Sequence, residues 1–461
     1  MRFRPFFEVF FLLFVVSFFL KLGADLLELP AVEAGYLALF AAGCLCLFDK
    51  HRPFDSLKSL TALFFLAFFL YELVRAGWSF WHIAASKSSL AVMPRFQRYV
   101  SSVIPWLLNF GFFFLGLLQF KTRPQVSRFL WLLSLGGFLL AIATIPPLLI
   151  KGSMGYEGSD GRTAFFPSFV YFHPLVSKYF VSCYAHPNYV GDVIALGFFP
   201  AAGLLFYSLQ RFAEALKSGK EHARPSVSSL GLLAIFTGAE ALAIILLFSR
   251  GTIICFVSAF LVFLVAVSAK YFSRVHLGIA LVVLAVVSGF LIWAANLRAT
   301  WKEVASSKKE VTTSNENTSF GTNREGAHRA VAIYRAFPVL GVGRKGYASV
   351  AKVFSTPQGN HNVMSDFQAQ CHYLEVLAEE GLGAWLYFLF IVAYFLESVW
   401  GLVRTKSRFQ FVSGLSLAAT VFMVLLHAGV KPVMEFFAIA APTYLFMGAS
   451  LAVLREDFAH A

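Results

Sequence analysis

The chain has 461 residues, of which 58% are hydrophobic and only 14% are charged, and its formal net charge is +13. Soluble proteins carry about 25% charged residues, so this composition excludes the soluble globular class and indicates many membrane-spanning helices. A basic excess would suggest nucleic-acid binding in a soluble domain, but here lysines and arginines that flank membrane spans account for much of it. We therefore expect no nucleic-acid partner.

Twelve apolar runs are long enough to cross a lipid bilayer as helices, because about 20 residues at 1.5 Å each cover a hydrocarbon layer of roughly 30 Å. The first run has a basic start but a long, bulky core and no close cleavage site, so we expect a retained helix and not a signal peptide. The predicted fold class is an all-α polytopic membrane protein. The runs are 5–23, 31–48, 57–75, 100–120, 128–148, 189–209, 227–248, 251–269, 276–296, 381–403, 409–430 and 434–454.

The distribution of lysine and arginine favours a topology with both termini inside. In that arrangement the short inner segments hold more basic residues than the short outer ones, as the positive-inside rule requires. The organisation predicted is nine transmembrane helices over 1–296, one large outer loop over 297–380 and three more helices over 381–461. We expect short helices within the loop.

The first polar outer segment, 149–188, ends in His186-Pro187-Asn188 just before a predicted helix. Proline is favourable in the first turn of a helix, so one interpretation is an ordinary helix start. The functional interpretation is a polar rim for a lipid headgroup, made by His186 and Asn188.

The second polar outer segment is Ser249-Arg250-Gly251, which joins two apolar runs. It can be a hairpin turn in which Gly251 permits the bend and Arg250 marks the membrane interface. However, an arginine on the side with fewer positive charges runs against the topological preference, which favours a function.

The third polar outer segment is the loop 297–380. Within 324–337 the sequence predicts an amphipathic helix that ends at Pro338 and lies on the protein or the membrane surface. Its basic side chains would be available to anions. Apolar residues recur there at helical spacing at Ala330, Ile333, Tyr334 and Phe337, and the basic residues are Arg324, Arg329 and Arg335. The following Gly341-Val-Gly-Arg-Lys-Gly346 lacks the strand and the Ser or Thr of a phosphate-binding loop, and predicts a glycine turn.

Five short motifs occur in order on the outer side of this topology. They are His186-Pro-Asn188, Ser249-Arg-Gly251, Asn323-Arg324, Phe337-Pro-Val-Leu-Gly-Val-Gly343 and Tyr373-Leu-Glu-Val-Leu-Ala-Glu-Glu-Gly-Leu-Gly383. With them the chain resembles the O-antigen ligase and polymerase family over about residues 180–405, while the first five helices match only in character. No single motif is specific, but their order and common side make the pattern informative.

The resemblance implies a multi-helix membrane glycosyltransferase of the GT-C type, in the bacterial inner membrane, with its active site facing the periplasm. It implies transfer of a glycan from undecaprenyl diphosphate to a sugar hydroxyl, with no metal and no cofactor. We expect an O-antigen ligase, whose acceptor is lipid A core. A polymerase, whose acceptor is another lipid-linked glycan, is the alternative because both use the same donor.

The leaving lipid diphosphate develops negative charge, which arginine stabilises through bidentate and permanently charged contacts. Arg250 matches the helix-connecting arginine of the family, and Arg324 matches the arginine that opens its loop helix. We assign both to the diphosphate, together with Ser249. His186, Asn188 and Arg329 are expected to line the substrate.

The base that receives the proton of the acceptor hydroxyl stays open. Histidine is the usual choice, but Gln370-Cys371 stands where the resemblance leads us to expect His-Asn. His372 lies two residues later, which on a continuous helix turns a side chain by about 200°. His361 lies nine residues earlier, and Glu379 and Glu380 are the carboxylate alternatives.

Two carboxylates inside the predicted spans support a rival class. Asp192 and Glu240 lie within apolar runs, and intramembrane acids also mark proton or ion paths. A secondary transporter or flippase is therefore an alternative, as is a scaffold without catalytic activity. Transporters commonly show internal repeats, and the chain shows no duplication. We expect Glu240 to pair within the bundle, because it is too far along its helix to neutralise Arg250.

Overall fold

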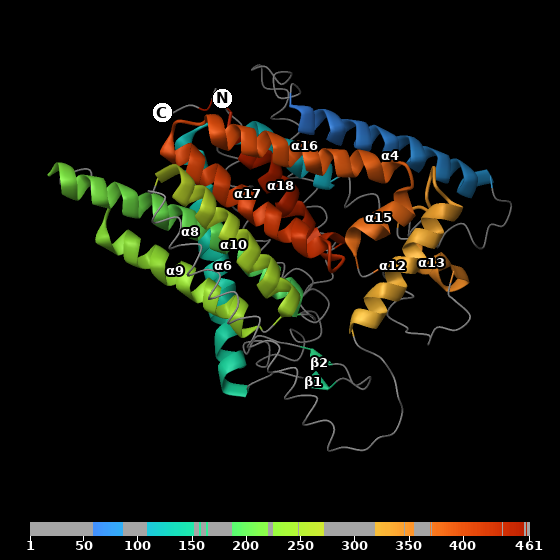
Figure 1. The fold of residues 1–461 in the computed structure, drawn as a ribbon, viewed down its shortest axis with the longest axis horizontal. Coiled ribbons are helices and arrows are strands. Elements are labelled where there is room, and N and C mark those ends of the chain that lie inside the picture. The colour runs from blue at the N-terminus through green and yellow to red at the C-terminus, as the bar shows by residue number, and fades with distance from the viewer. Residues whose placement is uncertain are drawn as a thin grey trace.

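The computed structural model is a bundle of long helices with a smaller group of short helices at one side (Figure 1). It describes residues 59–85, 108–151, 156–157, 163–164, 187–219, 225–247, 249–271, 319–344, 346–354, 369, 371–435, 437–455 and 458. The predicted runs 5–23, 31–48 and 276–296 lie outside these ranges.

Most of the long helices follow the predicted apolar runs, but α4 (Leu60–Ala85) and α8 (Pro187–Ser218) continue beyond the predicted ends at 75 and 209. Ser226 caps one helix by accepting a hydrogen bond from Ser229 N, and Ser407 caps another by accepting from Gln410 N. The helices are α4 (Leu60–Ala85), Leu108–Gln119, α6 (Arg123–Lys151), α8 (Pro187–Ser218), α9 (Val227–Leu246), α10 (Arg250–Tyr271), α16 (Gly383–Arg404), α17 (Arg408–Ala428) and α18 (Phe437–Val453).

Within the described ranges, six helices are long and apolar enough to cross a membrane. They lie in α6, α8, α9, α10, α16 and α17, and two shorter apolar helices lie at Leu108–Gln119 and Ile439–Val453. The prediction of an all-helical, multi-span chain is thus supported by length and composition. A two-stranded antiparallel pair, β1 (Tyr156–Glu157) and β2 (Thr163–Ala164), is the exception to the helical fold.

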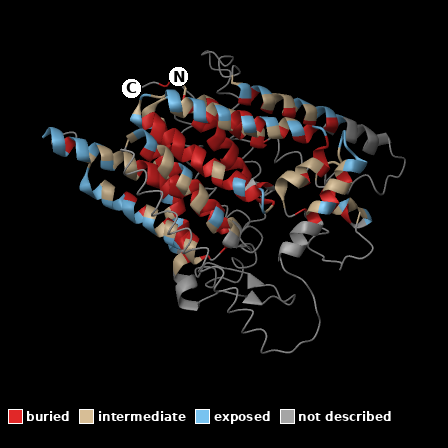
Figure 2. Ribbon diagram, viewed as in Figure 1, coloured by how far each residue is buried: buried red, intermediate tan, exposed pale blue. Residues whose placement is uncertain are grey.

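The centre of the bundle is formed by α8 and α17. In the most apolar stretch of each helix, 83% of the residues of α8 and 89% of those of α17 are buried, against 28% in α9 and in α16. Figure 2 shows the buried residues gathered in the middle of the bundle. Leu232 and Ile235 of α9 and Leu396 of α16 are exposed, as expected of side chains that face lipid.

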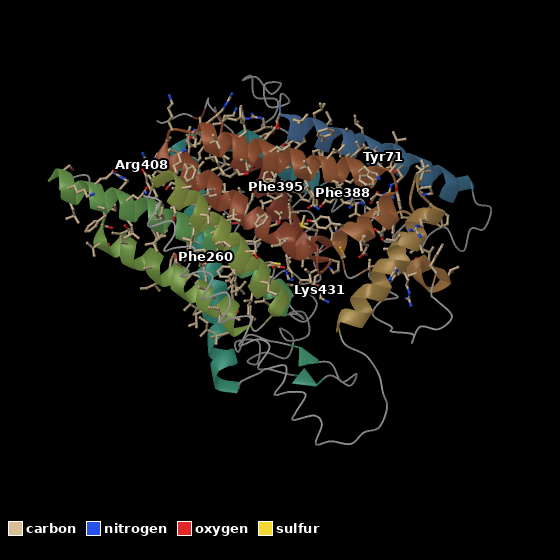
Figure 3. The ribbon with its side chains drawn as sticks, in the orientation of Figure 1. Tyr71, Phe260, Phe388, Phe395, Arg408 and Lys431 are labelled. Atoms are coloured by element: carbon tan, nitrogen blue, oxygen red, sulfur yellow. The ribbon has the colours of Figure 1, made fainter. Side chains whose placement is uncertain are left out.

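Aromatic side chains fill the space between these helices (Figure 3). Phe395 of α16 meets Phe422 of α17 with ring centroids 5.9 Å apart, and Phe65 of α4 stacks on Phe390 at 4.3 Å. Such pairs add about 0.5–1.5 kcal/mol beyond simple burial. Because the chain has 54 phenylalanines, many contacts between its helices are contacts between aromatic rings.

The short helices belong to the predicted loop and have a small core of their own. They are α12 (Ser319–Ala336), α13 (Tyr347–Val350), the 3₁₀ turn η5 (Ala351–Phe354) and α15 (His372–Glu380); a further 3₁₀ turn, η6 (Val433–Glu435), precedes α18. Their core consists of Ala330, Ile333, Tyr347, Ala351, Ala369 and Ala378.

The amphipathic helix predicted over 324–337 is confirmed as α12, and it ends at Ala336 just before Pro338. Ala330 and Ile333 are fully buried, as expected. Phe337 lies one residue beyond the helix and is 45% exposed, so the buried stripe is shorter than the sequence suggested. The glycine turn is also confirmed, because Gly341 and Gly343 have φ of 63° and 88°, values that favour glycine.

Candidate functional site

Three helix ends meet at one end of the bundle, where α8 and α10 begin and α17 ends. We call this the loop end. His427 in the last turn of α17 contacts Asp192 of α8 and faces Gly251 of α10. Tyr373 of α15 donates its hydroxyl to the carbonyl of Leu425, 2.5 Å away. The loop end therefore collects residues from four helices that are far apart in the sequence.

The Ser249-Arg250-Gly251 motif is a capped helix start. Arg250 is the first residue of α10, and the buried Ser249 caps the helix. The Ser249 hydroxyl donates to Thr252 Oγ1 at 2.9 Å and accepts from Thr252 N at 3.3 Å. The amides of a first helical turn carry partial positive charge, so the backbone here can bind an anion beside Arg250. The side chain of Arg250 lies outside the described residues.

Asp192 and His427 form a buried pair next to this helix start. Both side chains are 0% exposed, and His427 Nδ1 lies 2.8 Å and 2.9 Å from the two carboxylate oxygens of Asp192. A β-carbon on Gly251 would lie only 3.0 Å from His427 Nε2, so the imidazole edge lies against the first turn of α10. Sequence analysis weighed Asp192 as an intramembrane acid but missed His427.

His372 is the first residue of α15, so its side chain is not fixed by a helix that runs through the preceding positions. Cys371 before it has extended backbone angles, so the helix does not run through this position, and a rotation of about 200° along a continuous helix does not separate His372 from it. His372 Nε2 lies 3.4 Å from the hydroxyl of Tyr387, and Nδ1 has no hydrogen-bond partner among the described residues. Burial, and then the nearby Arg344, lower the pKa of His372 to about 3. The imidazole is therefore neutral at pH 7.

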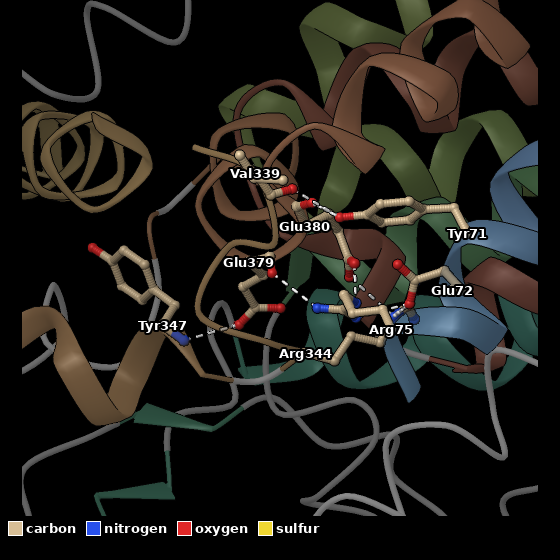
Figure 4. A network of polar contacts seen from close by, with 8 residues as sticks. All are labelled: Tyr71, Glu72, Arg75, Val339, Arg344, Tyr347, Glu379 and Glu380. Carbon is tan, nitrogen blue, oxygen red and sulfur yellow. Dashed lines mark hydrogen bonds and ion pairs between the residues drawn. The ribbon is translucent and has the colours of Figure 1, made fainter. Parts of the chain in front are cut away.

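An ion-pair network anchors α15 to α4 (Figure 4). Arg75 Nη2 lies 2.8 Å from Glu72 and 2.7 Å from Glu380, and Arg75 Nη1 donates to the carbonyl of Glu379 at 3.0 Å. Arg344 adds contacts of its Nε with Glu380 at 3.2 Å and Glu72 at 3.5 Å. Burial raises the pKa of Glu380 despite the neighbouring Arg75. The network fixes the end of the helix that begins with His372.

Backbone pairing adds to this anchor. Val342 N and Gly343 N of the glycine turn donate to the carbonyls of Ala378 and Glu379, at 3.1 Å and 3.0 Å. The Tyr71 hydroxyl donates to the carbonyl of Glu380 at 2.7 Å. The glycine turn therefore holds the end of α15 in place, and it positions Arg344 near His372.

The remaining predicted residues are distributed as follows. Glu379 is buried, and its carboxylate accepts the amide of Tyr347 at 3.1 Å, so α15 and α13 are tied together there. Arg329 is only 2% exposed on α12. Arg324 lies on the same helix and Asn188 in the first turn of α8, but both side chains lie outside the described residues, as do His186 and His361 entirely.

Glu240 is buried in the middle of the bundle without the partner expected for it. Its two carboxyl oxygens have no hydrogen-bond partner among the described residues. They lie against Gly137 of α6 and Gly197 of α8, where added β-carbons would lie 2.3 Å and 2.6 Å from Oε1. The two glycines make room for this carboxyl.

These helices and their polar loop end define a multi-pass helical membrane protein with a candidate site at one end of the bundle. Residues 232–389 match the family described as O-antigen ligase, which confirms the resemblance over this segment. Members of the family are membrane glycosyltransferases of the ligase and polymerase types. No curated protein matches the chain.

The matched segment includes Ser249-Arg250-Gly251, α12, α15 and the start of α16. It does not include Asp192 or His427, which flank it in the sequence and complete the loop end in space.

Proposed function

We propose that the chain transfers a glycan from undecaprenyl diphosphate to a sugar hydroxyl of lipid A core, as an O-antigen ligase facing the periplasm of the bacterial inner membrane. The observation that carries the proposal is the meeting of two family motifs on the last turn of α17. Gly251 of the first motif faces His427, and Tyr373 of the other binds the carbonyl of Leu425. Donor and acceptor groups have to meet in this way for transfer.

The first motif suits the donor. When the bond between the sugar and the diphosphate breaks, the leaving oxygen takes the electron pair. Preorganised donors stabilise such charge most effectively when they are already in place. Arg250, the partial positive charge at the start of α10 and Arg324 of α12 would supply this stabilisation. Ser249 contributes by capping α10, which fixes where this helix and Arg250 at its first position begin.

The α15 motif suits the acceptor. A hydroxyl of the acceptor sugar attacks the anomeric carbon and gives up its proton. His372 is neutral, and its Nδ1 is available among the described residues. Because a histidine with a pKa of about 3 is a weak base, we assign it the orientation of the hydroxyl, and the proton passes to solvent water as the bond between the hydroxyl oxygen and the anomeric carbon forms. His361 and Glu379 are the alternative bases.

Residues at the rim would complete the substrate site. His186 and Asn188 precede the turn of α8 that carries Asp192, which favours a lining role near the lipid headgroup. Arg329 lies on α12 with Arg324, on the helix proposed to contact the donor. The large loop 297–380, between the helices of 1–296 and 381–461, would then cover the site.

The acceptor decides between ligase and polymerase. Purified protein is incubated with undecaprenyl-diphosphate glycan and, separately, with lipid A core or a second lipid-linked glycan, and products are separated by mass. We expect glycan joined to lipid A core. Products lengthened only on the lipid-linked glycan would replace the ligase by a polymerase. No transfer to any acceptor, combined with donor crossing a liposome membrane, would favour the transporter class.

The arginines are tested by exchange for lysine. Arg250→Lys or Arg324→Lys should lower transfer by about tenfold to a hundredfold while the protein still inserts, because a point charge lacks the planar guanidinium fork. Arg408→Lys is the matched control, since Arg408 is exposed, lies at the opposite end of α17 and pairs with Glu214. Equal activity of the Arg250 and Arg408 variants would remove the diphosphate role.

A further inference from the structure

The buried pair at the loop end leaves one polar atom unsatisfied. His427 is 0% exposed, its Nδ1 is held by Asp192, and its Nε2 has no hydrogen-bond partner among the described residues. Most buried polar atoms have a partner, and a missing one costs stability. A buried nitrogen of this kind is explained most simply by a ligand that is bound only during function.

The unsatisfied nitrogen is aimed at the start of α10. The absent β-carbon of Gly251 would stand 3.0 Å from Nε2, so the imidazole lies directly against the first helical turn. Gly191 of α8 packs equally closely on Thr252, where a β-carbon would lie 2.5 Å from Thr252 Cγ2. This close packing holds the pair of Asp192 and His427 in register with the helix start. An anion at this N-terminus would have Nε2 beside it.

The two nitrogens of His427 face different groups. Both oxygens of Asp192 lie within hydrogen-bond distance of Nδ1, so this nitrogen is already engaged and only Nε2 remains for a ligand. A phosphate oxygen is an ionised partner, and hydrogen bonds with one ionised partner are about twice as strong as neutral ones.

We propose that His427, oriented by Asp192, is a third donor to the lipid diphosphate at the start of α10. The inference rests on the proposed function and extends it to residues outside the matched family segment. No proton passes through His427: the bond between the sugar and the diphosphate breaks, the leaving oxygen keeps the electron pair, and Nε2–H donates to a phosphate oxygen. His427 is thus a binding residue, and Asp192 a positioning residue.

Two amide variants separate this role from a purely structural one. In His427→Asn the amide nitrogen can replace Nδ1 and keep the contact with Asp192, but nothing replaces Nε2. In His427→Gln the amide nitrogen can reach the position of Nε2, but nothing replaces Nδ1. A structural role predicts that the Asn variant behaves like the wild type, whereas a binding role predicts the larger loss in that variant.

The measurement is binding of farnesyl diphosphate to the purified full-length chain, with farnesol as the uncharged control probe. We expect the Asn variant to bind the diphosphate about tenfold to a hundredfold more weakly, the Gln variant to lie between it and the wild type, and farnesol binding to be unchanged. His328→Asn, on the exposed face of α12, is the matched control and should bind like the wild type.

The outcomes separate the two proposals. Wild-type affinity for farnesyl diphosphate in the Asn variant would overturn the role of His427 while leaving glycan transfer intact. If that variant does not fold, Asp192→Asn asks the same question by altering the group that orients the imidazole, and unchanged affinity there has the same meaning. A wild-type protein that neither binds farnesyl diphosphate nor transfers glycan would overturn the proposed function itself.

Discussion

Replacing Arg75 by alanine should destabilise the protein strongly, because this arginine is buried between two carboxylates. It is 6% exposed, lies 2.8 Å from Glu72 and 2.7 Å from Glu380, and donates to the carbonyl of Glu379. The variant would leave two buried acids facing each other with only Arg344 as a counter-ion. Breaking a buried pair by removing one partner costs about 3–5 kcal/mol.

An exposed ion pair in the same bundle provides the comparison. Arg408 pairs with Glu214, and their side chains are 47% and 55% exposed. Such a pair contributes about 0–1 kcal/mol, so Arg408→Ala should change stability little. The two variants remove the same side chain and the same charge. They differ in burial and in the number of partners, since Arg75 contacts two carboxylates and a carbonyl and Arg408 one carboxylate, so a difference of several kcal/mol is expected.

The assay is thermal unfolding of both variants in one detergent, followed by glycan transfer at a temperature where both are folded. Arg75→Ala should unfold at a clearly lower temperature than Arg408→Ala and should lose activity, because Glu380 closes the helix that His372 opens. Adding Glu380→Gln to Arg75→Ala should restore part of the stability by removing one unpaired charge. Equal unfolding temperatures for the two single variants would refute the anchoring role of the network.

Two further predictions concern single positions. His372→Gln should gain stability relative to the wild type when the pH is lowered from 7.5 to 5. The unfolded histidine binds a proton below about pH 6.5 and the folded one only below about pH 3, so lowering the pH through this window destabilises the wild type. Unfolding temperatures at both pH values check this, and an unchanged difference contradicts it. Gly137→Ala should lower the unfolding temperature, since its β-carbon would lie 2.3 Å from Glu240 Oε1, whereas Gly231→Ala on α9 meets nothing within 4 Å. Equal effects of the two glycine variants would show that Glu240 can move aside.

The long helices could be predicted from the sequence because a bilayer sets their length and apolar character. The runs 227–248 and 409–430 became α9 and α17 with ends displaced by no more than two residues. The hydropathy pattern carries no information on which helix is central. Both runs are apolar throughout, yet α17 is 89% buried and α9 only 28%, because burial depends on neighbours that a single run does not identify.

The residues of the candidate site likewise could be predicted where the signal is local and not where it depends on packing. Ser249-Arg250-Gly251 and the start of α15 could be found because each is a short local pattern at the end of an apolar run. Arg344 was not predicted as a site residue because its glycine-rich surroundings indicated only a glycine turn, and the contacts that tie this turn to α15 are tertiary.

His427 had no local signal at all, since its partner Asp192 lies 235 positions earlier. A histidine near the end of an apolar helix is unremarkable until an acid on another helix holds one of its nitrogens and leaves the other facing Gly251. The pair can form only after α8, α10 and α17 have packed. The arginine motif could therefore be found from the sequence, whereas the buried histidine beside the start of α10 is recognisable only in the folded bundle.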